Sequence, residues 1–185
     1  LFQKGLSGER FTLRLELKLI ADVGLVWFPN AGKSSLLNEL TRAQSRGANY
    51  PFTTLEPNLG VYFDLILADI PGLIEGASEG KGLGTQFLRH IERSRVVVHV
   101  LAADAGESEE IYKNYLTVRG ELKQYGGDVE AKKELVVLNK TDLIDEEKVG
   151  EIVKFLAKKK IRVLPISCGT LSGIDLLKKE LLRLV

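Results

Sequence analysis

The sequence predicts an α/β fold, in which a doubly wound, mostly parallel six-stranded sheet carries helices on both faces. Short apolar runs alternate with helix-like stretches from residue 19 to the end of the 185-residue chain. This alternation is typical of parallel strands joined by crossover helices. Runs such as Val96–Leu101 are apolar on both faces, as expected for central strands covered by helices on each side. A hydrophobic content of 44% is enough for one compact domain with a single core.

The individual elements follow from the same alternation. The expected strands are Ile20–Val26, Leu59–Phe63, Leu65–Ile70, Val96–Ala102, Leu135–Leu138 and Arg162–Ile166. The expected helices are Lys33–Arg42, Thr85–Arg93, Glu107–Tyr125, Glu146–Lys160 and Gly173–Leu184. Only Asp64 separates the second and third strands, which is too little for a two-residue hairpin turn. We therefore expect either a truncated hairpin or a segment missing from the sequence at this place.

The first 18 residues differ from the rest of the chain. They contain Gly5 and Gly8, and then alternate apolar and polar residues over Phe11–Leu17. This pattern favours the tail of a preceding domain with a linker or an added strand. We expect residues 19–185 to form the compact domain. Because the sequence contains no Met, we expect it to begin partway through a gene product.

Composition limits the possible partners. Lys and Arg number 26 against 25 acidic residues, a balance that gives no general attraction to nucleic acid, although a local basic patch remains open. The single cysteine, Cys168, cannot form an internal disulfide, which favours a reduced, cytoplasmic location. No apolar stretch approaches the ~20 residues that span a bilayer, so we expect no membrane partner. We expect the isolated domain to be monomeric.

A candidate phosphate-binding loop follows the first strand and opens a helix. Backbone N–H groups at a helix N-terminus can converge on a β-phosphate. Lys33 can reach the β and γ phosphates, and the Ser34 hydroxyl can complete a Mg²⁺ shell. By itself, Gly-Lys-Ser at a helix start can also arise by chance. The expected nucleotide contacts in this loop are Phe28, Pro29, Asn30, Ala31, Gly32, Lys33, Ser34 and Ser35.

Further motifs occur in the order that a GTP site requires. Asp69 ends a strand 36 residues after Lys33, where a carboxylate can hold Mg²⁺ through a water. The segment Asp69-Ile70-Pro71-Gly72 places Ile70 and Pro71 near the nucleotide, and a Gly72 N–H can meet the γ-phosphate. Such an Asp-x-x-Gly segment is weak evidence alone and strong in this register.

Base recognition is predicted from Asn139-Lys140-Thr141-Asp142, which follows the strand Leu135–Leu138. The carboxylate of Asp142 can accept two hydrogen bonds from guanine, a donor pair that adenine does not present. This argues against an ATPase. The stem of Lys140 would lie against the base, and Asn139 would tie this loop to the phosphate loop. The alternative for this segment is a helix cap after a strand.

The end of the last strand supplies another expected contact. A backbone N–H of Ser167 or Cys168 can reach guanine O6. The Cys168 thiol itself has no base placed beside it, so we do not expect it to be a nucleophile.

Several stretches of the chain closely resemble the Obg family of ribosome-associated GTPases. They are Leu15–Val26, Tyr50–Val61, Asp69–Ala77, Gly80–Gly84 and Phe87–Arg93. The resemblance covers nearly the whole chain and is most specific between residues 15 and 95. It implies that residues 1–14 are the end of a glycine-rich Obg domain, and that any C-terminal domain would begin after residue 185.

The resemblance also implies a first switch at Phe52-Thr53-Thr54. Thr54 would supply the second Mg²⁺ ligand, with Thr53 as the alternative. A second switch would begin at Leu73. The family's work would be GTP-dependent assembly or surveillance of the large ribosomal subunit, through contacts with its RNA and proteins. Guanine-nucleotide alarmones are further ligands that the resemblance implies.

The expected hydrolysis is slow. Many GTPases orient the attacking water with a Gln after Asp-x-x-Gly, but here that position is Leu73. In loops of the sequence Asn-Ala-Gly-Lys-Ser, the Asn can help hold a K⁺ ion, so Asn30 is either a K⁺ ligand or a loop-stabilising amide. The candidate catalytic residues are Lys33, Asn30, Thr54 and Gly72. For His90 and His99 we expect structural roles, with His99 a satisfied core residue.

Trp27 departs from the phosphate-loop pattern, since it stands where the first glycine of G-x-x-x-x-G-K-S is expected. A tryptophan here predicts backbone strain of about 1–3 kcal/mol. The alternative is an indole that folds over apolar surface and leaves the loop intact. If the loop is damaged, the domain would be an interaction module with impaired nucleotide binding or hydrolysis.

Overall fold

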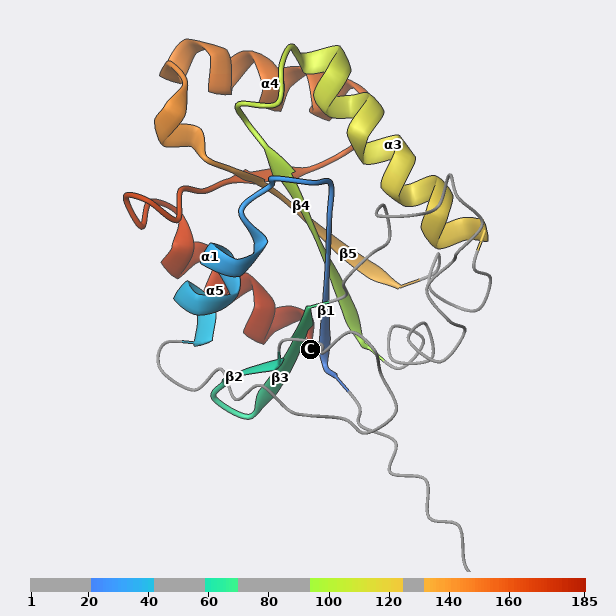
Figure 1. Ribbon diagram of the computed structural model, residues 1–185, viewed down its shortest axis with the longest axis vertical. Coiled ribbons are helices and arrows are strands. Elements are labelled where there is room, and N and C mark those ends of the chain that lie inside the picture. The colour runs from blue at the N-terminus through green and yellow to red at the C-terminus, as the bar shows by residue number, and fades with distance from the viewer. Residues whose placement is uncertain (1–20, 42–58, 70–93, 125–131) are drawn as a thin grey trace, which may run out of the picture.

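The sheet of the computed structural model has six strands in the order β2-β3-β1-β4-β5-β6 (Figure 1). The structure describes residues 21–41, 59–69, 94–124 and 132–185. Only the β2–β3 pair is antiparallel, and the four other pairs are parallel. The strands are β1 Val23–Trp27, β2 Leu59–Tyr62, β3 Leu65–Asp69, β4 Val96–Ala102, β5 Lys133–Asn139 and β6 Val163–Pro165. The predicted doubly wound fold is confirmed.

Four α-helices are described, and they cover both faces of the sheet (Figure 1). They are α1 Lys33–Thr41, α3 Ser108–Gln124, α4 Glu146–Lys158 and α5 Ile174–Leu184, and a 3₁₀ turn, η2, spans Thr141–Leu143. None of the described helices is long and apolar enough to cross a membrane. The predicted helix Thr85–Arg93 and the predicted tail at residues 1–18 lie outside the described residues.

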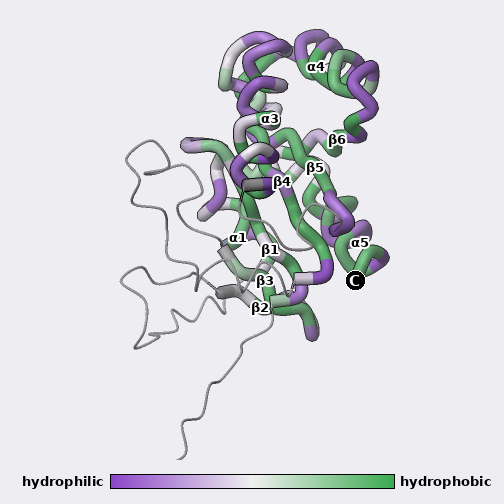
Figure 2. Tube along the Cα trace, turned by 90° about the vertical axis from the view of Figure 1, so that its right-hand side faces the viewer, coloured by the Kyte–Doolittle hydropathy of each residue, from purple (hydrophilic) through white to green (hydrophobic). Residues whose placement is uncertain are grey.

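The core has two halves, one on each side of the sheet. On one side, buried residues of α1 and α5 pack against alternate residues of β1 and β4, including Leu25 and Val98. On the other side, α3 and α4 pack against the intervening β4 residues and against β5 and β6. Figure 2 shows apolar residues along the strands and alternating polar and apolar residues along α4. This division places successive side chains of one strand in different cores.

The β2–β3 hairpin corrects the sequence prediction. Tyr62 and Leu65 form the closing pair, so Phe63 and Asp64 make a two-residue turn. Phe63 leaves the strand because its φ is 51°, in the left-handed region that two-residue hairpin turns require. The expectation that the gap is too short is therefore wrong. Positive φ at a bulky residue is rare, which is why the pattern did not indicate it.

The start of β1 is held to both of its neighbours by Asp22. Its N–H donates to Ile66 O at 2.8 Å, and its carboxylate accepts from the Ile66 N–H at 3.0 Å. On the other side, its carbonyl accepts from the N–H groups of Arg95 and Val96. One residue thus joins β1, β3 and the segment leading into β4, at the end of the sheet away from the Trp27 end of β1.

Candidate nucleotide-binding site

The loop between β1 and α1 makes a tight turn over Phe28–Gly32. Two of its residues have a left-handed backbone, Asn30 with φ 65° and Gly32 with φ 87°. Gly32 is also required by space, since a Cβ there would collide with the side-chain amide of Asn139. Beyond the turn, α1 begins at Lys33 with Ser34 and Ser35 exposed in its first turn. The turn therefore presents a helix N-terminus that can receive a phosphate.

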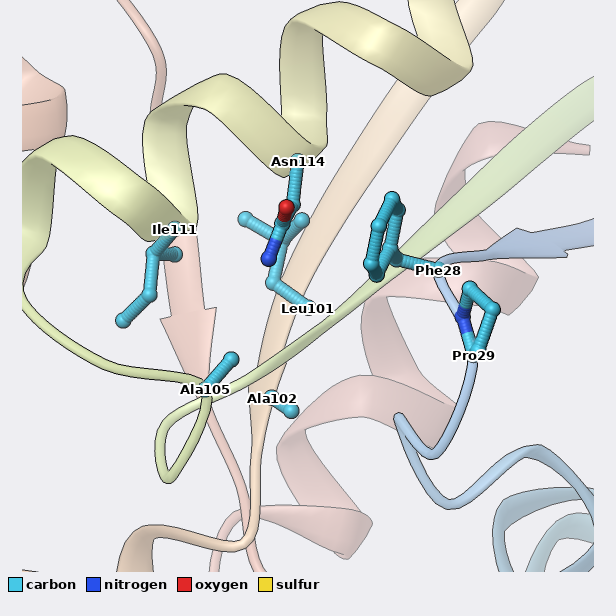
Figure 3. A pocket seen from close by; sticks show the side chains of 7 residues that line it. All are labelled: Phe28, Pro29, Leu101, Ala102, Ala105, Ile111 and Asn114. Carbon is cyan, nitrogen blue, oxygen red and sulfur yellow. The ribbon is translucent and has the colours of Figure 1, made fainter. Parts of the chain in front are cut away.

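Phe28 and Pro29 direct their side chains away from the helix start. Figure 3 shows both beside an apolar pocket, with Phe28 facing Asn114 of α3. The other lining residues come from the end of β4, the loop after it and α3: Leu101, Ala102, Ala105 and Ile111. Phe28 and Pro29 therefore line a pocket together with residues of α3, and the nucleotide contacts predicted for them stay a prediction.

Trp27 is the last residue of β1 and pairs in register with Val100 of β4. The described non-glycine residues with positive φ do not include Trp27, so the predicted backbone strain is wrong. Its half-buried indole packs against the core cluster on the α1 and α5 side. The ring also lies beneath Lys33, with the Nζ atom 4.2 Å from its centroid. The tryptophan thus contacts the first residue of α1 through its ring.

Asn139 joins the phosphate loop to the base side of the site, as predicted. Its Nδ2 donates to Ala31 O at 2.9 Å, and its Oδ1 accepts from the Cys168 N–H at 3.2 Å. The residue is only 1% exposed, so both hydrogen bonds are shielded from solvent at the asparagine. The side chain therefore holds three separate loops in one arrangement.

The carboxylate of Asp142 is exposed and held in place by Ser167, whose Oγ donates to Asp142 Oδ1 at 2.6 Å. The same Oγ accepts from the Thr170 N–H at 3.0 Å, which orients the hydroxyl. Asp142 Oδ2 faces Gly169, where a Cβ would lie 3.0 Å away. The role of the Ser167 hydroxyl was missed by sequence reasoning, which considered only the backbone of that residue.

Lys140 is held by Asp104, the second residue after β4. The Nζ and Oδ2 atoms are 2.8 Å apart, and Lys140 itself has a left-handed backbone with φ 65°. Asp104 was also missed by sequence reasoning. A signal was present, since Asp104 follows a strand adjacent to β5, and carboxyl ends of neighbouring parallel strands meet at one edge.

The backbone amides of Ser167 and Cys168 both donate to partners within the protein. The Cys168 N–H donates to Asn139 Oδ1, and the Ser167 N–H donates to Ser172 O at 2.9 Å. Both N–H groups have a partner within the protein, and the contact of one of them with guanine O6 stays a prediction. Burial raises the pKa of the Cys168 thiol to about 11, which agrees with the expectation that it is not a nucleophile.

The expected Mg²⁺ ligands are only partly described. Ser34 presents its exposed hydroxyl in the first turn of α1, and Asp69 is the last residue of β3, paired in register with Leu25 of β1. Hydroxyl and carboxylate oxygens are the donors that Mg²⁺ prefers. The helix α1 begins, and the strand β3 ends, at the same edge of the sheet, because β1 and β3 are parallel. The other predicted site residues lie outside the described residues: Phe52, Thr53, Thr54, Ile70, Pro71 and Gly72.

His99 lies in the core, as predicted, on the α3 side of β4. Its Nδ1 is 3.1 Å from Glu134 Oε1, and its ring stacks on Tyr115 at 4.8 Å between centroids. Burial lowers the pKa of His99, which favours the neutral ring. The residue is not fully satisfied, however, since Nε2 has no hydrogen-bond partner within the described part of the chain. His90 lies outside that part.

A helix start that can take phosphates, tied to a loop that can take guanine, places the chain in the class of P-loop GTP-binding domains. Residues 22–140 match the family model described as 50S ribosome-binding GTPase. The GTPase Obg of Pelagibacter ubique is 51% identical over 100% of this chain and 57% of its own length. The GTPase Obg of Herpetosiphon aurantiacus is 48% identical over 98% of this chain and 43% of its own length. The chain belongs to the Obg family of GTPases.

Solved structures support the fold. An S. thermophilus NFeoB mutant bound to GDP matches with a TM-score of 0.64 at 21% identity, covering 90% of this chain and 63% of that one. The cytosolic domain of L. pneumophila FeoB matches with a TM-score of 0.57 at 25% identity, covering 88% of this chain and 69% of that one. The chain spans about half the length of the curated relatives it matches.

Proposed function

We propose that this domain binds GDP and GTP and hydrolyses GTP slowly, as a molecular switch. The observation that carries the proposal is the Asn139 tether, which connects Ala31 in the phosphate loop to the loop that holds Asp142. This connection supports the proposal, because the residues that would contact the phosphates and the guanine belong to loops that are bonded to one another. Asp142 would accept hydrogen bonds from the guanine N1–H and exocyclic amine, while Lys140 would lie along the base.

The phosphate end of the nucleotide would be held by the first turn of α1. The N–H groups of the loop and the helix start would bind the β-phosphate, and Lys33 would neutralise charge on the β and γ phosphates. Ser34, Asp69 and Thr54 are the residues that would hold Mg²⁺, which supplies charge neutralisation when bound. The Gly72 N–H would contact the γ-phosphate.

Base recognition is tested with Asp142→Asn. The substitution places an amide donor against the guanine donors, so GDP affinity should fall by roughly a few kcal/mol, while xanthine nucleotides, which carry a carbonyl at that position, should gain. Titration with GDP, XDP and ADP measures the change. The parent should prefer GDP over ADP, and an Asp142→Asn variant that still prefers GDP over XDP would remove Asp142 from base recognition.

For hydrolysis, we propose a turnover below roughly one per minute, because Leu73 stands where a water-orienting Gln is found in many GTPases. Asn30 would hold K⁺ near the bridge between the β and γ phosphates. Its exposed position at a left-handed turn suits both an ion ligand and a loop-stabilising amide. Hydrolysis measured in matched K⁺ and Na⁺ buffers separates the two, since equal rates would leave Asn30 structural.

The family assignment supports a cellular role beyond nucleotide binding. We propose that the protein containing this domain acts in the cytoplasm in assembly of the large ribosomal subunit, and that guanine-nucleotide alarmones compete for the same site. The match to a 50S ribosome-binding GTPase family supports the first of these. Co-sedimentation of the full-length protein with large subunits, in GDP and in a non-hydrolysable GTP analogue, provides the test. Equal binding in both nucleotides would contradict a switch.

A further inference from the structure

The indole of Trp27 stands on the side of the sheet where the phosphate loop opens. Trp27 follows Val23 and Leu25 in the alternation along β1, and all three contact the core cluster that contains α1. The half-buried ring lies beneath Lys33, with the Nζ atom 4.2 Å from the ring centroid. The lysine expected to bind the terminal phosphates is thus in contact with an aromatic face at the end of the strand that precedes the phosphate loop.

An ammonium over an indole face is held by the charge distribution of the ring. The interaction contributes about 0.5–1 kcal/mol at exposed sites and more where the charge is desolvated, and tryptophan is the strongest of the aromatic partners. The terminal phosphates of a nucleotide would bind the same ammonium, because a lysine in this position reaches the β and γ phosphate oxygens. A flexible four-carbon stem allows Nζ to move between the ring and the phosphates.

We propose that Trp27 determines affinity for the phosphate end of the nucleotide, because its indole face competes with the terminal phosphates for the Lys33 ammonium. The inference rests on the proposed nucleotide binding and adds a specific modulator to it. Trp27 is a positioning residue in this role, since it acts through Lys33. Its effect on affinity is expected for ligands with a β-phosphate. It is not expected for guanosine, which has no phosphate to bind Lys33.

The test compares Trp27→Leu, Trp27→Phe and Trp27→Gly with the parent in the 185-residue domain. Leucine retains apolar bulk but has no aromatic face, phenylalanine retains a weaker face, and glycine removes the side chain. Affinities for GDP and for guanosine are measured for each by competition against a fluorescent guanine nucleotide. Loss of about 0.5–1 kcal/mol of competing interaction predicts about two- to fivefold tighter GDP binding by Trp27→Leu. Trp27→Phe should lie between the parent and Trp27→Leu, and guanosine affinity should stay unchanged.

Each other outcome overturns the proposal in a recognisable way. A gain in Trp27→Gly without one in Trp27→Leu would show that bulk alone matters. Weaker GDP binding by Trp27→Leu would show that the indole supports Lys33 instead of competing for it. Equal gains in affinity for GDP and guanosine would show that the substitution changes the whole site and not the Lys33 contact alone. If neither the parent nor any variant binds GDP, the proposed function itself fails along with the inference; if only the parent binds GDP, the inference alone fails.

Intrinsic fluorescence gives a second measurement in the parent protein. Trp27 is the single tryptophan of the chain, so emission reports its surroundings without interference. Saturation with GDP should change the emission as Lys33 leaves the ring, whereas saturation with guanosine should not. The same change in emission with both ligands would contradict the proposed competition, because guanosine has no phosphate to bind the Lys33 ammonium.

Discussion

Removing the side chain of Asn139 tests how the two halves of the site are held together. In Asn139→Ala, the bonds from Nδ2 to Ala31 O and from the Cys168 N–H to Oδ1 are both lost. A buried group left unpaired costs about 1–3 kcal/mol, and a typical intramolecular hydrogen bond contributes about 1 kcal/mol. Ala31 is 1% exposed and should carry the full penalty, whereas the half-buried Cys168 amide can recover a bond to water.

We therefore expect the free energy of unfolding to fall by about 2–4 kcal/mol in Asn139→Ala. GDP affinity should fall by about tenfold or more, since the phosphate loop loses its connection to β5. Urea denaturation monitored by circular dichroism measures the first quantity, and calorimetric titration with GDP measures the second.

The matched control is Thr41→Val at the far end of α1. Its hydroxyl donates to Leu37 O at 2.7 Å and is buried, so its loss costs about 1 kcal/mol without touching the site. GDP affinity of this control should stay within about twofold of the parent. If Asn139→Ala is destabilised by less than about 1 kcal/mol with GDP affinity unchanged, the tether does not hold the loops as described.

Three further outcomes are expected. Asp104→Asn should weaken GDP binding by about two- to fivefold, because the partly exposed ion pair that holds Lys140 is lost. Unchanged GDP affinity would show that Asp104 does not contribute to the site. Gly60→Ala should destabilise the domain by about 1–3 kcal/mol in urea denaturation, because the new Cβ would meet the side chain of Thr41, and a neutral result would show that α1 can shift. Cys168 should react with iodoacetamide slowly at pH 8 and faster as pH approaches about 11, because only the thiolate is nucleophilic; rapid labelling at pH 8 would contradict the raised pKa.

Most of the features that the sequence could predict depend on apolar runs or on the order of the motifs. Strands Val96–Ala102 and Leu65–Asp69 are mostly apolar, and their predicted bounds differ from the structure by at most one residue. The Asn139 contact with the phosphate loop was also predictable, because that residue follows a strand in a motif whose partner loop was already identified. These features depend on local pattern or on a known sequence of motifs.

The remaining features depend on contacts that no local pattern encodes. The pair of Lys140 with Asp104 joins residues 36 positions apart, through two neighbouring strands. Phe63 adopts a positive φ because the hairpin must close, against the preference of a bulky residue. The contact between the Trp27 ring and Lys33 depends on which face of β1 the ring occupies, and the sequence alone did not reveal that face.

Asp22 adds hydrogen bonds at one end of β1 that the other end of the strand does not share. Its backbone and carboxylate bind Ile66 twice and hold Arg95 and Val96 as well, whereas the opposite end of β1 leads into the phosphate loop. Opening the sheet from the Asp22 end requires several bonds to break together. Amide hydrogen exchange should therefore be slowest around Ile66 and Val96 and faster toward Trp27, because local opening follows the least-bonded route. The nucleotide site lies at the opposite end of β1 from these Asp22 bonds.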